Sequence, residues 1–182
     1  VIASVLPVSE VALVHADPPY GGGDLAVLRN DTTSARSKRA KVWKPIVGDD
    51  KPFAPAFLLA LDRPTVLWGA NHYSDRVPGS PSWLFWDKRP DIVSDMQADG
   101  ELAWTNLGGP LRTFRHVWRH FVRGPETGSH IHPTQKPIAL CSFVYARAKL
   151  KRGDLVFVPY LGSGPDLPAA VAMGLRVIAC DV

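Results

Sequence analysis

The chain has 182 residues, of which 46% are hydrophobic and 21% are charged, a composition typical of one globular domain with a sizeable core. Lysine and arginine outnumber aspartate and glutamate by 21 to 17, so the net charge of +4 leans modestly toward an anionic partner. No apolar run has membrane-spanning length and no basic-then-apolar signal segment opens the chain, so we expect no membrane partner. Two cysteines without paired spacing fit the reducing cytoplasm.

Short apolar runs alternate with helical patterns along the chain. Strands are expected at residues 11–16, 65–69, 83–86, 101–106, 155–158 and 176–180. Helices are expected at residues 53–62, 138–149 and 165–173. Strands that alternate with helices predict a layered α/β fold, and we expect residues 1–182 to form a single domain.

A compact polar motif, Asp17-Pro18-Pro19-Tyr20, directly follows the first expected strand, and three glycines come next. Because prolines cannot continue a β-ladder, the strand should stop there and present Asp17 and Tyr20 at its carboxyl end, where open α/β sheets bind ligands. An acid, a rigid backbone carbonyl and an aromatic face together suit a flat ring that bears an amino group. An ordinary strand-ending turn also fits these four residues.

Two basic stretches are candidates for contact with a nucleic-acid backbone. The first lies in an irregular segment, residues 24–52, and the second spans residues 112–123, where arginines alternate with aromatic rings. The candidate DNA-binding side chains are Arg36, Lys38, Arg39, Lys41, Arg112, Arg115 and Arg119. A solvated charged surface is the alternative interpretation of both stretches.

Residues 113–123 fit both periodicities, because their aromatic residues match helical spacing while the alternation of rings and charges matches a strand. On a helix, His116 and His120 would share one face at a spacing that suits a metal ion. The sequence offers no evident third ligand, so we expect no metal site.

A second glycine-rich turn lies near the end of the chain. Leu161-Gly162-Ser163-Gly164 separates an expected strand from an expected helix, and Asp181 follows the last strand. Glycines let a backbone approach a ligand closely, and an acid at the end of the next strand suits the hydroxyls of a ribose. A tight turn without a ligand is the alternative.

The order of these motifs resembles that of the amino-group DNA methyltransferases of the β arrangement, in which the catalytic motif precedes the cofactor motif. The matching order is Asp17–Tyr20, a basic variable region, His-Pro-Thr-Gln-Lys-Pro at 132–137, and Leu-Gly-Ser-Gly at 161–164. Residues 67–73, 83–88 and 101–106 resemble phage-type and prophage-type members. The resemblance spans nearly the whole chain and implies a Rossmann-like, S-adenosylmethionine-dependent methyltransferase sheet with helices on both faces and permuted motifs.

This resemblance implies transfer of a methyl group from S-adenosylmethionine to the exocyclic amino nitrogen of a base flipped out of double-stranded DNA. By family habit Asp17 favours adenine N6 over cytosine N4. Asp17 and the Pro18 carbonyl would hold the amino group, Pro19 completes the motif, and Tyr20 would stack on the base. The implied cofactor-binding residues are Asp17, His132, Thr134, Lys136, Pro159, Tyr160, Leu161, Gly162, Ser163, Gly164 and Asp181.

The same resemblance places a short target-recognition segment at residues 91–131 and the protein in the cytoplasm of a bacterium or a phage-infected host. It leaves open the recognition sequence, the oligomeric state, with a homodimer among the alternatives, and a cognate restriction enzyme. Methylation of RNA or of a protein amide is a third possibility, against which the motif at 132–137 argues.

Two residues depart from the family pattern near the glycine-rich turn. Val158 stands where members usually carry an acid that meets the polar end of the cofactor, and Pro165-Asp166 stands where a threonine usually follows the second glycine. We expect Asp166 to place a negative charge near the cofactor's carboxylate. The alternative function is therefore a DNA-binding, methyltransferase-like protein with impaired cofactor binding.

Overall fold

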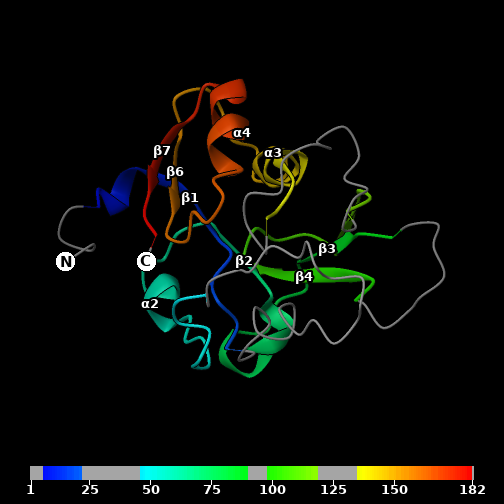
Figure 1. Cartoon of the computed structure of the whole chain (residues 1–182). Helices are drawn as coiled ribbons and strands as arrows, with labels where there is room; N and C mark the ends of the chain where they lie inside the picture. Colours follow the sequence, from blue (N-terminus) through cyan, green and yellow to red (C-terminus); the bar gives the residue numbers. More distant parts are fainter. Residues whose placement is uncertain (1–5, 22–45, 90–97, 119–134, 182) are drawn as a thin grey trace, which may run out of the picture.

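The computed structural model describes residues 6–21, 46–89, 98–118 and 135–181, and its centre is a seven-stranded sheet of order β5-β3-β4-β2-β1-β6-β7 (Figure 1). The strands are β1 (Val11–Ala16), β2 (Thr65–Trp68), β3 (Trp83–Asp87), β4 (Gly100–Thr105), β5 (Arg112–Arg115), β6 (Leu155–Val158) and β7 (Arg176–Ala179). Of these seven strands, β4 alone runs antiparallel to its neighbours.

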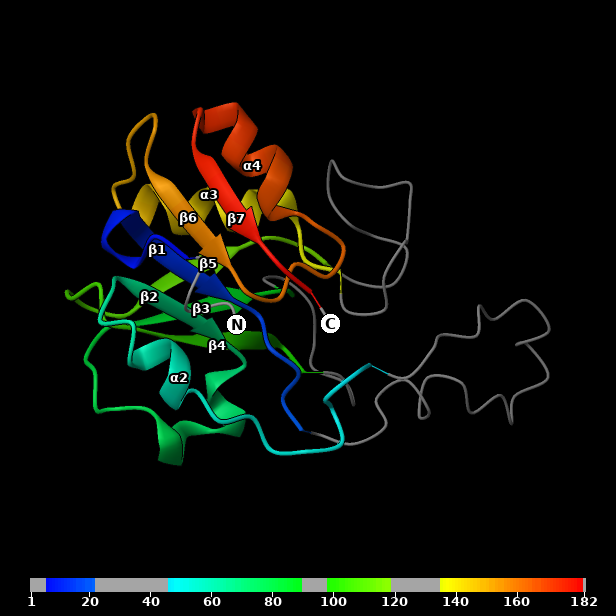
Figure 2. The same cartoon turned by 90° about the vertical axis from the view of Figure 1, so that its left-hand side faces the viewer.

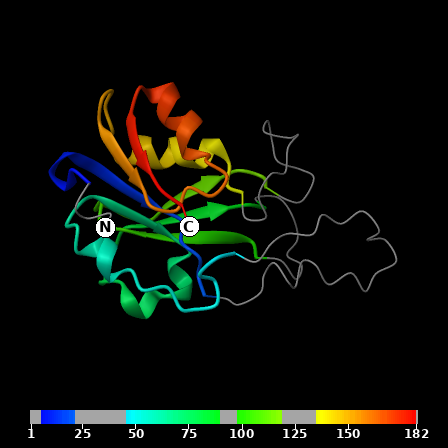
Figure 3. The ribbon, with the colours of Figure 1, turned by 60° about the vertical axis from the view of Figure 1, so that its left-hand side comes forward.

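Helices cover both faces of the sheet, as predicted. Helices α3 (Ile138–Arg147) and α4 (Asp166–Met173) pack on one face, and α2 (Ala56–Leu59) lies on the other (Figures 2 and 3). Three 3-10 turns complete the described elements: η2 (Val8–Glu10), η3 (Ala70–His72) and η4 (Ser74–Arg76). None of the helices in the described ranges is both long and apolar enough to cross a bilayer.

Strand β1 is an inner strand of the sheet, between β2 and β6, and contributes to both hydrophobic clusters. Alternate side chains of a strand point to opposite faces. Leu13 accordingly packs on the α3/α4 side, whereas Val14 and Ala16 pack with the cluster that contains Leu58 of α2. His15 shares the α3/α4 face with Leu13 and contacts the ring of Tyr145 in α3. The strand that carries Asp17 at its end is therefore fixed from both sides.

The segment that fitted both a helix and a strand forms a strand where it is described. Residues 112–115 are β5, which pairs in parallel with β3, and residues 116–118 have no regular structure. His116 is therefore not on a helix, and His120 lies outside the described residues. Strands β4 and β5 both fall within 91–131, so part of the predicted target-recognition segment belongs to the central sheet.

The helix predicted at residues 53–62 is shorter than expected. It has four residues, with Pro55 at its N-cap, because the chain turns at Asp62, whose φ of 50° is left-handed, to enter β2. The strand and helix predictions elsewhere agree with the structure to within two residues at each end.

All six parallel strands end at one edge of the sheet, and the antiparallel β4 begins there. Asp17 follows β1, Lys88 follows β3 and Asp181 follows β7, while Glu101 is the second residue of β4. This edge is where open α/β sheets bind ligands.

Candidate active site

The Asp17 carboxylate has a partner on each of its oxygens. The Tyr20 hydroxyl donates to Oδ1 across 2.7 Å, and Lys136 Nζ lies 2.9 Å from Oδ2. About a quarter of the Asp17 side chain stays exposed, at 26%, whereas Lys136 is nearly buried at 8%. The motif that ends β1 therefore meets the end of the 132–137 motif, two segments that are more than 100 residues apart in the sequence.

Lys136 also binds a second carboxylate. Its Nζ lies 2.6 Å from Glu101 Oε2, and Lys88 forms an ion pair with the other oxygen of Glu101. Burial raises the pKa of Glu101, but the charges of Lys136 and Lys88 outweigh that effect and lower it to about 2. Burial lowers the pKa of Lys136, yet Asp17 and Glu101 raise it well above its usual value. The four groups thus form a partly buried row of alternating charges.

Sequence reasoning missed two members of this row, Glu101 and Lys88. The sequence predicted Glu101 at the start of a strand, but it did not predict the direction of that strand. Since β4 is antiparallel, its first residues rather than its last reach the ligand edge. Lys88 lies over the Trp86 ring, with Nζ 4.5 Å from the centroid, and burial lowers its pKa.

The Tyr20 ring contacts His72 and the backbone at Gly69. It stacks on His72 with centroids 5.0 Å apart and planes 9° apart. Gly69 has a φ of 69°, and a Cβ there would collide with the Tyr20 ring. Burial, with the charges of Asp17 and Glu101, raises the pKa of the phenol. His72, from η3, is a further residue at this edge that the sequence did not mark as functional.

The glycine-rich turn and Asp181, both predicted to bind the cofactor, are in contact. The Gly162 amide donates to Asp181 Oδ2 across 2.9 Å, and the Leu161 amide donates to the Cys180 carbonyl. Gly162 has a φ of 53°, and a side chain there would meet nothing within 4 Å, so the backbone faces open space. Pro159 and Ser163 lie in the same β6–α4 connection, and Tyr160 lies edge-on to Phe53.

The two residues that depart from the family pattern, Val158 and Asp166, make different contacts in the structure. Val158 is buried in β6 and belongs to the hydrophobic core, so it offers no polar atom to a ligand. Asp166 is buried as well, and its Oδ1 lies 2.6 Å from His15 Nδ1. The expectation that Asp166 places its charge at the cofactor's carboxylate is wrong, because the side chain points from the first residue of α4 toward β1.

Several predicted site residues lie outside the described residues. They are Arg36, Lys38, Arg39, Lys41, Arg119, His132 and Thr134. Arg112 and Arg115 are described and lie exposed on the edge strand β5, with Arg115 Nε 3.6 Å from Asp87 Oδ2. Asp87 immediately precedes Lys88, so this arginine lies at the same edge of the sheet as the charged row.

No protein-family model matches the sequence. The chain is 24% identical over 136 residues to the type II methyltransferase M.EcaI of Enterobacter cloacae, a match that covers 68% of this chain and 30% of that protein. The chain thus spans less than a third of the length of this relative.

The fold is also similar to that of a solved DNA methyltransferase structure. The PvuII DNA methyltransferase (cytosine-N4-specific) superposes with a TM-score of 0.59 at 13% identity, covering 98% of this chain and 77% of that one. A complex of M1.HpyAVI with S-adenosylmethionine gives a TM-score of 0.47 at 17% identity, covering 94% and 82%. The fold is therefore that of the PvuII DNA methyltransferase. The predicted resemblance to the DNA amino-methyltransferases is confirmed as a similarity, while the phage-type detail stays a prediction.

Proposed function

We propose that this chain carries the catalytic machinery of a DNA methyltransferase that methylates an exocyclic amino group. The observation that supports this most is the Asp17 carboxylate, held by Lys136 at the ligand edge beside the aromatic ring of Tyr20. The type II methyltransferase relative supports DNA as the substrate. Membership of a restriction–modification pair is part of the same proposal.

In this proposal Asp17 and the Pro18 carbonyl accept hydrogen bonds from the amino group of the target base. These two acceptors turn the nitrogen lone pair toward the incoming methyl group, and Tyr20 stacks on the base, which must leave the duplex to reach them. Lys136 fixes Oδ2 of Asp17, so the carboxylate keeps one orientation. When the nitrogen–carbon bond formed, the bond between the methyl carbon and the sulfur of the donor would break, and the nitrogen would lose one proton to Asp17, the carboxylate that holds the amino group.

The residues of the glycine-rich turn fit the adenosine part of S-adenosylmethionine, which supplies an electrophilic methyl group when bound. Gly162 faces open space, and the exposed carboxylate of Asp181 can accept hydrogen bonds from ribose hydroxyls. Because Asp166 is turned into the core, it adds no repulsion at this turn. The same proposal assigns Lys136, Pro159, Tyr160, Leu161, Ser163 and Gly164 to the cofactor site, together with His132 and Thr134, which lie outside the described residues.

Adenine N6 is the favoured target, and cytosine N4 is the alternative because the same four-residue motif serves both reactions. The specificity of the PvuII enzyme for cytosine N4 supports keeping that alternative. A second function, DNA binding without methyl transfer, is favoured by Val158, which leaves the β6 end without the acid usual in the family.

The test is incubation with S-adenosylmethionine and mixed-sequence duplex DNA, followed by nucleoside mass spectrometry. We expect N6-methyladenine, and N4-methylcytosine would instead establish the alternative target. Asp17→Ala should abolish product while DNA affinity stays within about threefold. Asp75→Ala, a change of an exposed acid in η4, is the matched control and should leave the yield unchanged. DNA binding without measurable cofactor binding by calorimetry would favour the second function.

A further inference from the structure

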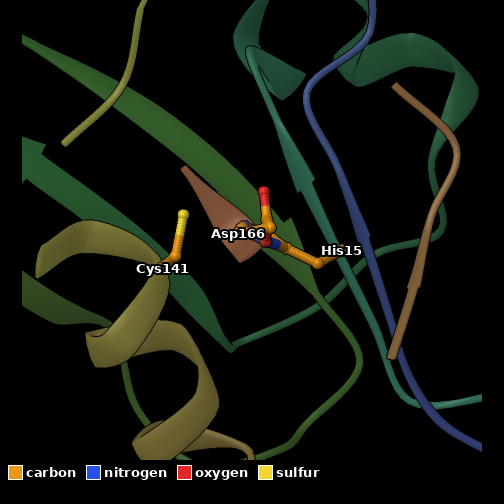
Figure 4. A group of neighbouring side chains, drawn as sticks. All are labelled: His15, Cys141 and Asp166. Atoms are coloured by element: carbon orange, nitrogen blue, oxygen red, sulfur yellow. The ribbon is translucent and has the colours of Figure 1, made fainter. Parts of the chain in front are cut away.

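A buried polar network lies directly beneath the candidate active site. His15 Nδ1 lies 2.6 Å from Asp166 Oδ1, and the Tyr145 hydroxyl donates to the same oxygen across 2.5 Å. The Trp68 indole N–H donates to His15 Nε2 across 2.9 Å. The network joins β1, β2, α3 and α4, and Figure 4 shows how His15, Asp166 and Cys141 converge.

The partners of His15 determine where its proton lies. An indole nitrogen can only donate, so Nε2 of His15 accepts and its hydrogen is on Nδ1, pointing at Asp166. Asp166 then receives donors from His15 and Tyr145. Burial raises the pKa of Asp166, but His15 and the hydrogen bonds from His15, Tyr145 and Cys141 outweigh burial and lower it. Every polar group in the network thus has a matching partner.

The same cluster has the residue types of a metal site, because ligand atoms of His15, Cys141 and Asp166 lie within 4.8 Å of one another. A metal on Nδ1 of His15 would move the ring hydrogen to Nε2. That hydrogen would then face the indole N–H of Trp68, donor against donor. The contacts therefore favour a hydrogen-bond network over a metal centre.

We infer that His15 and Asp166 are positioning residues that fix the glycine-rich turn relative to the catalytic motif. His15 lies two residues before Asp17 on β1, and Asp166 lies two residues after Gly164, so their contact links the two loops in addition to the pairing of β1 with β6. This inference rests on the proposed function, in which those two loops hold the two reactants.

The physical reason is the sensitivity of group transfer to alignment. A misplacement of about 1 Å between reacting groups can cost on the order of a hundredfold in rate. Core contacts of apolar residues tolerate small sliding, whereas hydrogen bonds at 2.6 and 2.5 Å to a single carboxylate oxygen restrict both distance and direction. Asp166 therefore limits movement of the α4 N-terminus relative to β1.

The test compares Asp166→Asn and His15→Gln with Val144→Ala, a core truncation in α3 that leaves the network intact. We expect both network variants to lower the single-turnover methyl-transfer rate by roughly tenfold to a hundredfold, with dissociation constants for S-adenosylmethionine and DNA within about threefold of wild type. Val144→Ala should lower the melting temperature at least as much while keeping the rate within about twofold.

Equal rate losses in all three variants would overturn the inference, because they would show that lost stability alone explains the effect. Unchanged rates in Asp166→Asn and His15→Gln would overturn it as well. Should these variants not fold, Tyr145→Phe removes a single donor from Asp166 and should still lower the rate several-fold. A wild-type protein that transfers no methyl group would refute the proposed function itself, so the two failures are distinguishable.

A readout independent of activity is the ¹⁵N spectrum of the His15 ring. We expect the Nδ1–H tautomer in the wild type and a changed ring signal in Asp166→Asn. Stoichiometric metal in the purified protein, found by elemental analysis, would overturn the hydrogen-bond assignment and with it the positioning role.

Discussion

Tyr20 donates its hydroxyl to Oδ1 of Asp17 across 2.7 Å, so the proposed catalytic carboxylate already holds a hydrogen bond where the amino group of a base must bind. Lys136 occupies the other oxygen. A carboxylate oxygen can accept two hydrogen bonds, so in the proposed function the Tyr20 hydroxyl competes with the amino group of the base for Asp17 without excluding it. The aromatic ring and the hydroxyl of this residue then have opposite effects, the ring favouring the bound base and the hydroxyl competing with it.

Tyr20→Phe separates these effects, because it keeps the ring and removes the competing hydroxyl. A hydrogen bond to a charged group contributes about 1.5–3 kcal/mol, and part of that is regained when the base no longer displaces it. We expect the single-turnover rate to stay at the wild-type level or rise a few-fold. Tyr20→Ala, which also removes the stacking surface, should lower it by more than about tenfold. A tenfold loss in Tyr20→Phe would instead assign the hydroxyl a positive role in catalysis.

Gly69→Ala should displace the Tyr20 ring, because the added methyl group collides with it and because the φ of 69° disfavours alanine. We expect a stability loss of about 1–3 kcal/mol and a drop in transfer rate of more than about tenfold. Gly79→Ala is the matched control, since nothing lies within 4 Å of its Cβ position and its φ is ordinary. Chemical denaturation and single-turnover assays measure both effects, and an active Gly69→Ala would show that the Tyr20 position is not critical.

The parts of the fold that follow from local patterns were predictable. Apolar runs predicted six of the seven described strands to within two residues, and the proline and glycine motifs marked where β1 and β6 end, whereas β5 was left open between a helix and a strand. The direction of β4 was not predictable, because side-chain alternation is the same in parallel and antiparallel strands. Glu101 was missed for that reason.

The orientation of Asp166 could not be predicted for a different reason. Its partner His15 is 151 residues away in the sequence, and no local pattern records such a contact. By position alone, the residue after a glycine-rich turn is expected to face the ligand. Asp166 instead points into the core, where it contacts the buried His15 of β1. This orientation follows from the packing of α4 on the sheet.

We expect the free energy of unfolding to fall in acid because of the lowered pKa of Glu101. Its pKa is about 2 in the folded protein against 4.5 for the unfolded group, so below pH 4.5 the unfolded chain binds the proton first. The stabilisation is fully present above pH 4.5 and is lost as the pH falls toward 2, on the order of 3 kcal/mol in all.

Denaturant titrations from pH 7 to pH 2 measure this loss. Glu101→Gln should be less stable at pH 7, because Lys136 and Lys88 lose the charge between them, and should show a flatter decline in acid. Glu10→Gln, which changes an acid in an exposed ion pair with Arg176, should keep the wild-type profile. An unchanged profile in Glu101→Gln would remove Glu101 as the source.

The arginines of β5 should contribute to DNA binding through phosphate contacts. Each phosphate neutralised by a cation adds about 0.9 to the slope of log affinity against log salt concentration. Replacing Arg112 and Arg115 together by glutamine should therefore weaken binding across all sequences and reduce that slope by about 2. Arg152→Gln is the control, because this exposed arginine precedes β6 at the opposite edge of the sheet. Fluorescence anisotropy with a labelled duplex, at salt concentrations from about 50 to about 300 mM, measures the slope for the double variant and for the control. An unchanged slope in the double variant would place β5 outside the DNA interface and leave phosphate contact to other basic segments of the chain.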